Sequence, residues 1–93
     1  MLYLISYDLN KEDKNYPALW EALRRDGAIK ILYSEWLVRL TGTALDAANR
    51  YLAYMDTNDS IFVTEVTNNT AWRGLQNEPH STSALQTNVR RVA

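Results

Sequence analysis

The 93-residue chain is 46% hydrophobic and 23% charged, and it contains no cysteine and a single histidine. Its length allows one hydrophobic core, and its composition is that of a globular domain rather than a disordered or low-complexity chain. The cysteine and histidine counts exclude a disulfide scaffold, a thiolate metal site and a site built from several histidines of one chain.

The charge balance argues against a generally basic nucleic-acid-binding protein. Ten Lys and Arg oppose eleven Asp and Glu, which gives a net charge of −1. A nucleic acid would therefore have to find a local basic patch. No apolar run is long enough to span a membrane, and the apolar N-terminus, interrupted by Asp8, is not expected to be a signal peptide. We expect a cytoplasmic protein with no membrane partner.

The first third of the chain predicts a strand, a turn and a helix. Residues 2–8 are apolar on both faces of an extended chain, which is typical of a central strand. Residues 10–15 are polar and turn-like. Apolar side chains at helical spacing then predict a helix that begins near Tyr16 and ends before Gly27.

The middle of the chain completes a recognisable order of elements. Residues 28–40 predict two short strands broken near Tyr33. Thr43, followed three residues later by an aspartate, resembles a capping box and predicts a helix over about 44–55. Residues 60–66 are rich in β-branched side chains and predict the last strand. The order βαββαβ predicts an α+β, ferredoxin-like fold, with two helices on one face of a four-stranded antiparallel sheet.

The pattern weakens after this strand. Residues 71–75 form a short apolar group, which we expect to dock against the sheet or a partner. We assign residues 1–75 to the ferredoxin-like domain and residues 76–93 to a C-terminal arm or frayed tail. Because residues 80–93 show no apolar periodicity, we expect their deletion to leave the fold intact.

Asp8 is the main candidate for chemistry. It ends an apolar strand where the chain leaves the sheet for a polar loop, and functional residues gather at such positions. Its carboxylate could act as a general base or hold a magnesium ion, which needs only one or two carboxylates. The alternative is that Asp8 caps the loop by accepting hydrogen bonds from backbone N–H groups. The residues alone leave both interpretations open.

Other polar residues give weaker indications. Ser34 lacks a neighbouring base, Glu35 and Glu65 fit solvated strand positions, and His80 fits a surface histidine. A weak nucleic-acid-binding patch, or alternatively a solvated helix end, is formed by Arg24, Arg25, Lys30 and Arg39. Several aromatic residues lie on expected strands, where they either stack on bases or pack under the helices: Tyr3, Tyr7, Tyr33, Trp36 and Phe62.

Three segments combine a strand, an aspartate, a loop and a helix in a specific order. They read LISYDLN at residues 4–10, YPALWEAL at residues 16–23 and YSEWLV at residues 33–38. Together they resemble the CRISPR-associated Cas-two superfamily, and most closely its stand-alone, SinR-like branch, which is related to virulence-associated protein D. The resemblance covers roughly residues 2–75.

This resemblance implies a ferredoxin-like homodimer, in which a strand after the fourth often extends the partner's sheet. In members that act as nucleases, an aspartate aligned with Asp8 lies near its dimer mate, and the pair binds a divalent metal. In the CRISPR adaptation complex the dimer bridges integrase subunits and holds duplex DNA on arginine-rich surfaces. Ser34 aligns with a serine of the family's third-strand motif, whereas Glu-Trp-Leu at residues 35–37 replaces the usual Val-Phe-Glu.

The sequence therefore predicts a Cas-two-like homodimer that acts as an endonuclease, on RNA in preference to DNA, and belongs to antiviral defence. Asp8 of both subunits is expected to be the catalytic and metal-binding residue, with Mg²⁺ or Mn²⁺ as the ion. The acidic balance favours the stand-alone branch over an adaptation subunit that contacts an integrase. The alternatives are a non-catalytic dimeric adaptor for nucleic acid or protein, and a toxin-like protein.

Overall fold

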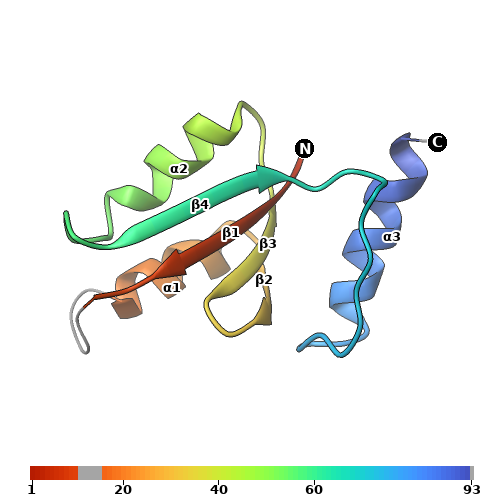
Figure 1. The fold of residues 1–93 in the computed structure, drawn as a ribbon, viewed down its shortest axis with the longest axis horizontal. Coiled ribbons are helices and arrows are strands. Elements are labelled where there is room, and N and C mark those ends of the chain that lie inside the picture. The colour runs from red at the N-terminus through yellow and green to blue at the C-terminus, as the bar shows by residue number, and fades with distance from the viewer. Residues whose placement is uncertain (11–15, 93) are drawn as a thin grey trace.

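A computed structural model describes residues 1–10 and 16–92 and shows an α+β fold (Figure 1). The elements are β1 (Leu2–Asp8), α1 (Tyr16–Arg25), β2 (Ile29–Leu32), β3 (Glu35–Arg39), α2 (Ala44–Leu52), β4 (Ser60–Glu65) and α3 (His80–Val92). The expected order is confirmed as far as β4, although α2 ends three residues before the expected helix end. The expected polar turn falls largely on residues 11–15, which lie outside the described residues.

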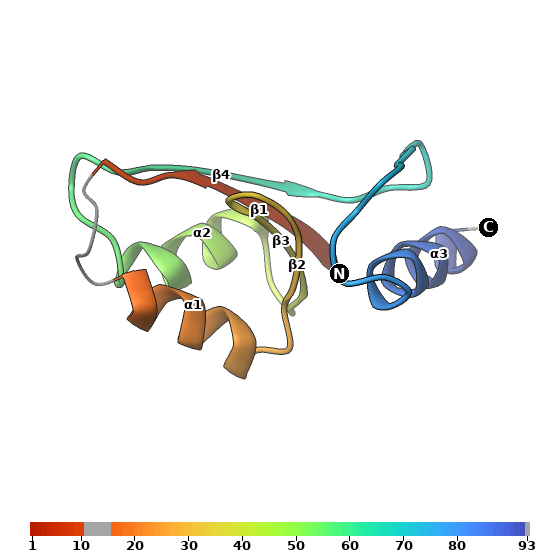
Figure 2. The same ribbon diagram turned by 90° about the horizontal axis from the view of Figure 1, so that it is seen from below.

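The four strands form one antiparallel sheet in the order β2-β3-β1-β4. This order places β1 in the interior of the sheet, as its two apolar faces require, and it is consistent with the ferredoxin-like arrangement expected from the sequence. Figure 2 shows α1 and α2 together on one side of the sheet, with α3 set apart from them. None of the helices in the described part of the chain is long and apolar enough to cross a bilayer.

Local signals fix the ends of the first two helices. Gly27 follows α1 with a φ of +80°, in the left-handed region that glycine adopts most easily, and so ends the helix. At the start of α2, the Asp46 N–H donates to Thr43 Oγ1 at 3.1 Å, and the Thr43 N–H donates to Asp46 Oδ2 at 2.9 Å. The capping box is thereby confirmed.

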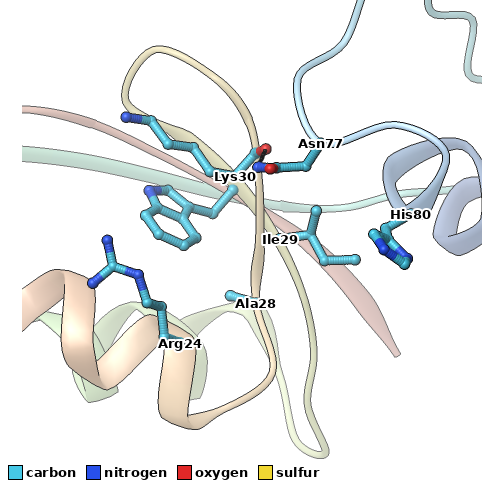
Figure 3. Close-up of a pocket in the computed structure, with 7 residues that line it drawn as sticks. Arg24, Ala28, Ile29, Lys30, Asn77 and His80 are labelled. Carbon is cyan, nitrogen blue, oxygen red and sulfur yellow. Dashed lines mark hydrogen bonds between the residues drawn. The ribbon is translucent and has the colours of Figure 1, made fainter.

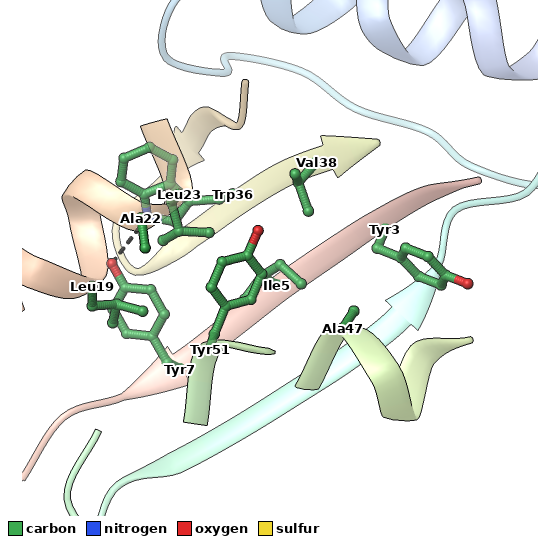
Figure 4. Packing of buried hydrophobic residues seen from close by; sticks show 10 residues of the cluster. All are labelled: Tyr3, Ile5, Tyr7, Leu19, Ala22, Leu23, Trp36, Val38, Ala47 and Tyr51. Carbon is green, nitrogen blue, oxygen red and sulfur yellow. Dashed lines mark hydrogen bonds between the residues drawn. The ribbon is translucent and has the colours of Figure 1, made fainter. Parts of the chain in front are cut away.

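The main core lies between the sheet and helices α1 and α2 (Figure 4). Its buried members are Tyr3, Ile5, Tyr7, Leu19, Ala22, Leu23, Trp36, Val38, Ala47 and Tyr51. The alternation of β1 sends three of these side chains, at residues 3, 5 and 7, to the same face. Burying this set of large apolar side chains supplies the main favourable term in folding.

A carboxylate joins the two core helices at their surface. Asp26, just after α1, accepts two hydrogen bonds from the Arg50 guanidinium, at 2.6 and 2.7 Å, and one from the Tyr51 hydroxyl at 2.8 Å. These donors, above all Arg50, hold the pKa of Asp26 below its usual value of 3.8. The buried Tyr51 hydroxyl is satisfied by this contact, and its pKa is raised by burial.

A second, smaller core covers part of the opposite face of the sheet. It joins residues from both ends of the chain: Leu2, Ile31, Leu37, Val66 and Leu85 are buried, with Trp72 and Leu75 packed against them. The Trp72 indole N–H donates to Thr82 Oγ1 at 3.1 Å. The apolar group at residues 71–75 therefore docks against the sheet, which is one of the two possibilities expected from the sequence.

The C-terminal segment is an ordered arm of the fold. Between residues 66 and 92 no strand follows β4; the chain passes instead into α3, which packs against β2. The Gln76 N–H donates to the Ile31 carbonyl at 2.8 Å, and Asn77 Nδ2 donates to the Lys30 carbonyl at 2.7 Å. These bonds occupy acceptors along the outer edge of β2. The strand that the resemblance places after the fourth is thus not seen here.

The expectation that residues 80–93 can be removed without effect conflicts with this packing. Leu85 is 3% exposed and Ser81, one turn earlier, is fully buried. The apolar residues at positions 84, 85, 89 and 92 of this segment are spaced as on one side of a helix, a short signal that the expectation overlooked.

We predict that Leu85→Ala lowers the free energy of unfolding by about 2 kcal/mol, because it leaves a cavity in the second core. Leu45→Ala on α2 is the matched control, since Leu45 is 68% exposed and its truncation should change stability by no more than about 0.5 kcal/mol. Urea unfolding of both variants measures the difference. Equal stability of the two variants would show that α3 does not support the sheet.

Candidate functional site

The Asp8 carboxylate is presented at the end of an interior strand. Asp8 is the last residue of β1, is exposed, and pairs across the sheet with Ser60 of β4. Because Tyr7 points into the main core, strand alternation places Asp8 on the opposite face, which it shares with Ser6. This end of that face is not covered by the second core, so the carboxylate stands on open surface.

Asp59, rather than Asp8, caps the loop around the strand end. Asp59 Oδ1 accepts a hydrogen bond from the Asn10 N–H at 2.7 Å, and its Oδ2 accepts one from the Asp56 N–H at 2.8 Å. None of the described residues donates a hydrogen bond to the Asp8 carboxylate. The capping role that was the alternative for Asp8 is therefore filled by a different aspartate.

Three hydrogen bonds fix Tyr7, the residue that precedes Asp8. The Tyr7 hydroxyl accepts hydrogen bonds from the indole N–H groups of Trp20 and Trp36, each at 3.0 Å. Figure 4 shows the bond to Trp36. The Tyr7 N–H donates to the Ser34 carbonyl at 3.1 Å. An exposed side chain on a backbone fixed in this way is the arrangement that catalytic and binding residues require.

The Ser34 position explains how the β2–β3 turn reaches β1. Its φ is +61°, a conformation that residues other than glycine adopt rarely. This turn aims the Ser34 carbonyl at the Tyr7 N–H and leaves the Tyr33 ring 85% exposed. Uncommon backbone conformations of this kind cluster at functional sites. Ser34 thus contributes to the site through its backbone, whereas sequence reasoning considered only its hydroxyl.

Asp8 borders two hollows in the surface. The first, about 190 Å³, lies on the open face of the sheet and is lined by Ser6, Tyr7, Asp8, Ser60, Ile61 and Phe62. The second, about 230 Å³, lies around the strand end and is lined by Tyr7, Asp8, Leu9, Trp20, Lys30, Tyr33 and Ser34. We call them the open-face hollow and the aromatic hollow. Asp8 is common to both and can reach a ligand in either.

The four basic residues singled out in the sequence do not form one patch. A cavity of about 550 Å³ is lined by Arg24, Ala28, Ile29, Lys30, Trp36, Asn77 and His80 (Figure 3). Arg24 and Lys30 therefore come together, whereas Arg25 donates to the Tyr54 hydroxyl at 3.2 Å and Arg39 ends β3. His80 is exposed, as expected of a surface histidine, and borders this cavity from the start of α3.

The aromatic residues singled out in the sequence divide into a buried and an exposed group. Tyr3, Tyr7 and Trp36 pack under the helices, whereas Tyr33 and Phe62 are 85% and 65% exposed. Trp20 of α1 packs against the main core and also reaches the strand end, because its indole N–H donates to the Tyr7 hydroxyl. The one sequence signal that indicated the β2–β3 turn was the break between the two expected strands near Tyr33.

No model of a known protein family matches the chain. The basis for a function is therefore the set of side chains around Asp8. Within residues 1–10 and 16–92, no group of three or more His, Cys, Asp or Glu is placed to hold a metal ion. A metal bound at Asp8 would need further ligands from water or from a second chain.

We predict that two aspartate substitutions differ in their effect on stability. Asp8→Ala should change the free energy of unfolding by no more than about 0.5 kcal/mol, because its carboxylate supports no described contact. Asp59→Ala should cost about 1–3 kcal/mol, because it leaves two backbone N–H groups without their acceptor. Thermal and urea unfolding of the two variants makes the comparison. A destabilised Asp8→Ala protein would assign Asp8 a structural role.

Proposed function

We propose that the protein is a homodimeric, divalent-metal-dependent endonuclease that acts on RNA in preference to DNA, with Asp8 of both subunits as the metal-binding carboxylates. The observation that carries this proposal is the state of Asp8. Its carboxylate is exposed, accepts no hydrogen bond from the described residues, and sits on a backbone fixed by Tyr7. The loop cap that would otherwise explain it is supplied by Asp59.

The donor set fits a magnesium or manganese ion. Such ions take oxygen ligands, and Mg²⁺ usually binds through one or two carboxylates while keeping several waters. One chain supplies a single carboxylate in Asp8, and a second copy related by a two-fold axis supplies the other. The ion, when bound, would activate a water and offset the charge that develops on a phosphodiester.

The open face of the sheet supports the pairing of two copies. Phe62 is 65% exposed and lines the open-face hollow. Large apolar side chains on a surface favour a protein contact. A two-fold contact through this face is self-complementary, and because Asp8 lines the same hollow as Phe62, it brings the two carboxylates toward each other.

We predict that the protein cleaves labelled single-stranded RNA in Mg²⁺ or Mn²⁺ and that Asp8→Asn lowers the rate at least about 100-fold, because the metal loses its protein ligand. Glu21→Gln, an exposed carboxylate on α1, is the matched control and should retain activity. Single-stranded and duplex DNA in parallel reactions measure the preference for RNA.

Three outcomes would contradict the proposal. Equal cleavage by the wild type and Asp8→Asn would indicate another site or a contaminant. No cleavage of any substrate by a folded dimer would favour the non-catalytic adaptor. A monomer mass by light scattering at micromolar concentration would remove the shared metal site.

A further inference from the structure

The aromatic hollow lies next to Asp8, but most of its lining consists of residues other than carboxylates. It is therefore a candidate binding site distinct from the proposed metal site. Its lining includes three aromatic residues, Tyr7, Trp20 and Tyr33, and one cation, Lys30. The hollow measures about 230 Å³, below the size usual for drug-like ligands, and suits a single flat ring system.

The hollow is largely pre-formed. The Trp20 indole is held on one side by its hydrogen bond to the Tyr7 hydroxyl and on another by the Tyr16 ring, 6.5 Å away between centroids. The turn that carries Tyr33 is tied to β1 through the Ser34 carbonyl. Walls fixed before binding reduce the ordering cost of holding a ligand.

The exposed Tyr33 ring is the unusual member of this set. Leu32 pairs with Glu35, so Tyr33 and Ser34 form a two-residue connection that carries the ring out of the core. An aromatic ring with 85% exposure contributes little to packing, but it offers a face on which another ring can stack. Each stacked base on such a ring is worth a measurable part of the affinity for single-stranded nucleic acids.

A cation lies over the Tyr33 ring. The Lys30 ammonium lies 5.6 Å from the centroid of the Tyr33 ring. Lys30 also lines the larger cavity that contains Arg24, so two cations follow one another along this surface (Figure 3). A nucleotide consists of a flat base joined through a sugar to phosphates. Its base matches the aromatic hollow, and its phosphates match the neighbouring cations.

We infer that the aromatic hollow binds one unpaired nucleobase of a single-stranded nucleic acid, stacked on Tyr33 beside Trp20, with neighbouring phosphates on Lys30 and Arg24. This inference rests on the proposed nuclease function, because it places the backbone next to that base alongside Asp8. A base within a duplex is stacked and paired and cannot enter the hollow, so the hollow selects single strands.

The test measures binding without cleavage. A fluorescein-labelled oligoadenylate RNA is titrated with the protein in EDTA and its anisotropy is followed. Tyr33→Ala should weaken binding roughly 5- to 100-fold, and Tyr33→Phe should leave it within about two-fold, because stacking needs the ring and not the hydroxyl. Lys30→Ala should weaken binding and lower the salt dependence by about one phosphate contact. Arg73→Ala, an exposed cation outside both sites, is the control.

A strand with the same backbone but abasic sugars separates base stacking from charge attraction. It should bind the wild type as weakly as the intact strand binds Tyr33→Ala, and it should not respond to Tyr33→Ala. Equal binding of intact strands by the wild type and Tyr33→Ala, equal binding of duplex and single strand, or no binding by the wild type would each overturn the inference. Single-stranded DNA shows whether the sugar matters.

These experiments can contradict either proposal without contradicting the other. Binding that depends on Tyr33, without cleavage in Mg²⁺ or Mn²⁺, would support the base site and contradict the nuclease. Cleavage that depends on Asp8, with binding indifferent to Tyr33, would support the nuclease and contradict the base site.

Discussion

The Tyr7 hydroxyl, which accepts hydrogen bonds from two indole N–H groups, is the contact on which the candidate site depends. The donors are Trp20 of α1 and Trp36 of β3, so one hydroxyl oxygen fixes the end of β1 against both α1 and β3. Buried donors that lose their acceptor are costly, which makes this junction strongly specified. Asp8 follows Tyr7 directly and presents an exposed side chain on a strand end that these bonds fix.

The two faces of the sheet explain where a site can lie. Helices α1 and α2 cover one face, and residues 71–75 with α3 cover part of the other. The uncovered remainder holds Asp8 and Phe62 at one end. Because the C-terminal arm also satisfies acceptors along the edge of β2, it closes one border of the sheet, whereas this end of the open face and the β4 edge are left uncovered by the described residues.

Much of the fold could be predicted because its signals are local. The apolar strand, the helix stripe, Gly27 and the capping box at Thr43 each act within a few residues and agree with one another. Helix α3 was missed because its apolar spacing, at residues 84, 85, 89 and 92, is short and sparse, whereas the contacts of Leu85 are with residues distant in sequence. Asp8 was singled out from its strand-end position. Of the two bonds to Asp59, the one from the Asp56 N–H is local to the turn, whereas the one from the Asn10 N–H depends on tertiary packing. The joining of Trp20, Lys30 and Tyr33 beside Asp8 also depends on tertiary packing.

The proposal that Asp8 of two chains binds one metal ion is tested most directly by the stoichiometry of metal binding. Calorimetric titration of the purified protein with Mn²⁺, with the mass of the protein measured in parallel, should give one ion for every two chains, and this binding should disappear in Asp8→Asn. Binding of one ion per chain, or binding that survives in Asp8→Asn, would contradict a metal site formed by the two carboxylates.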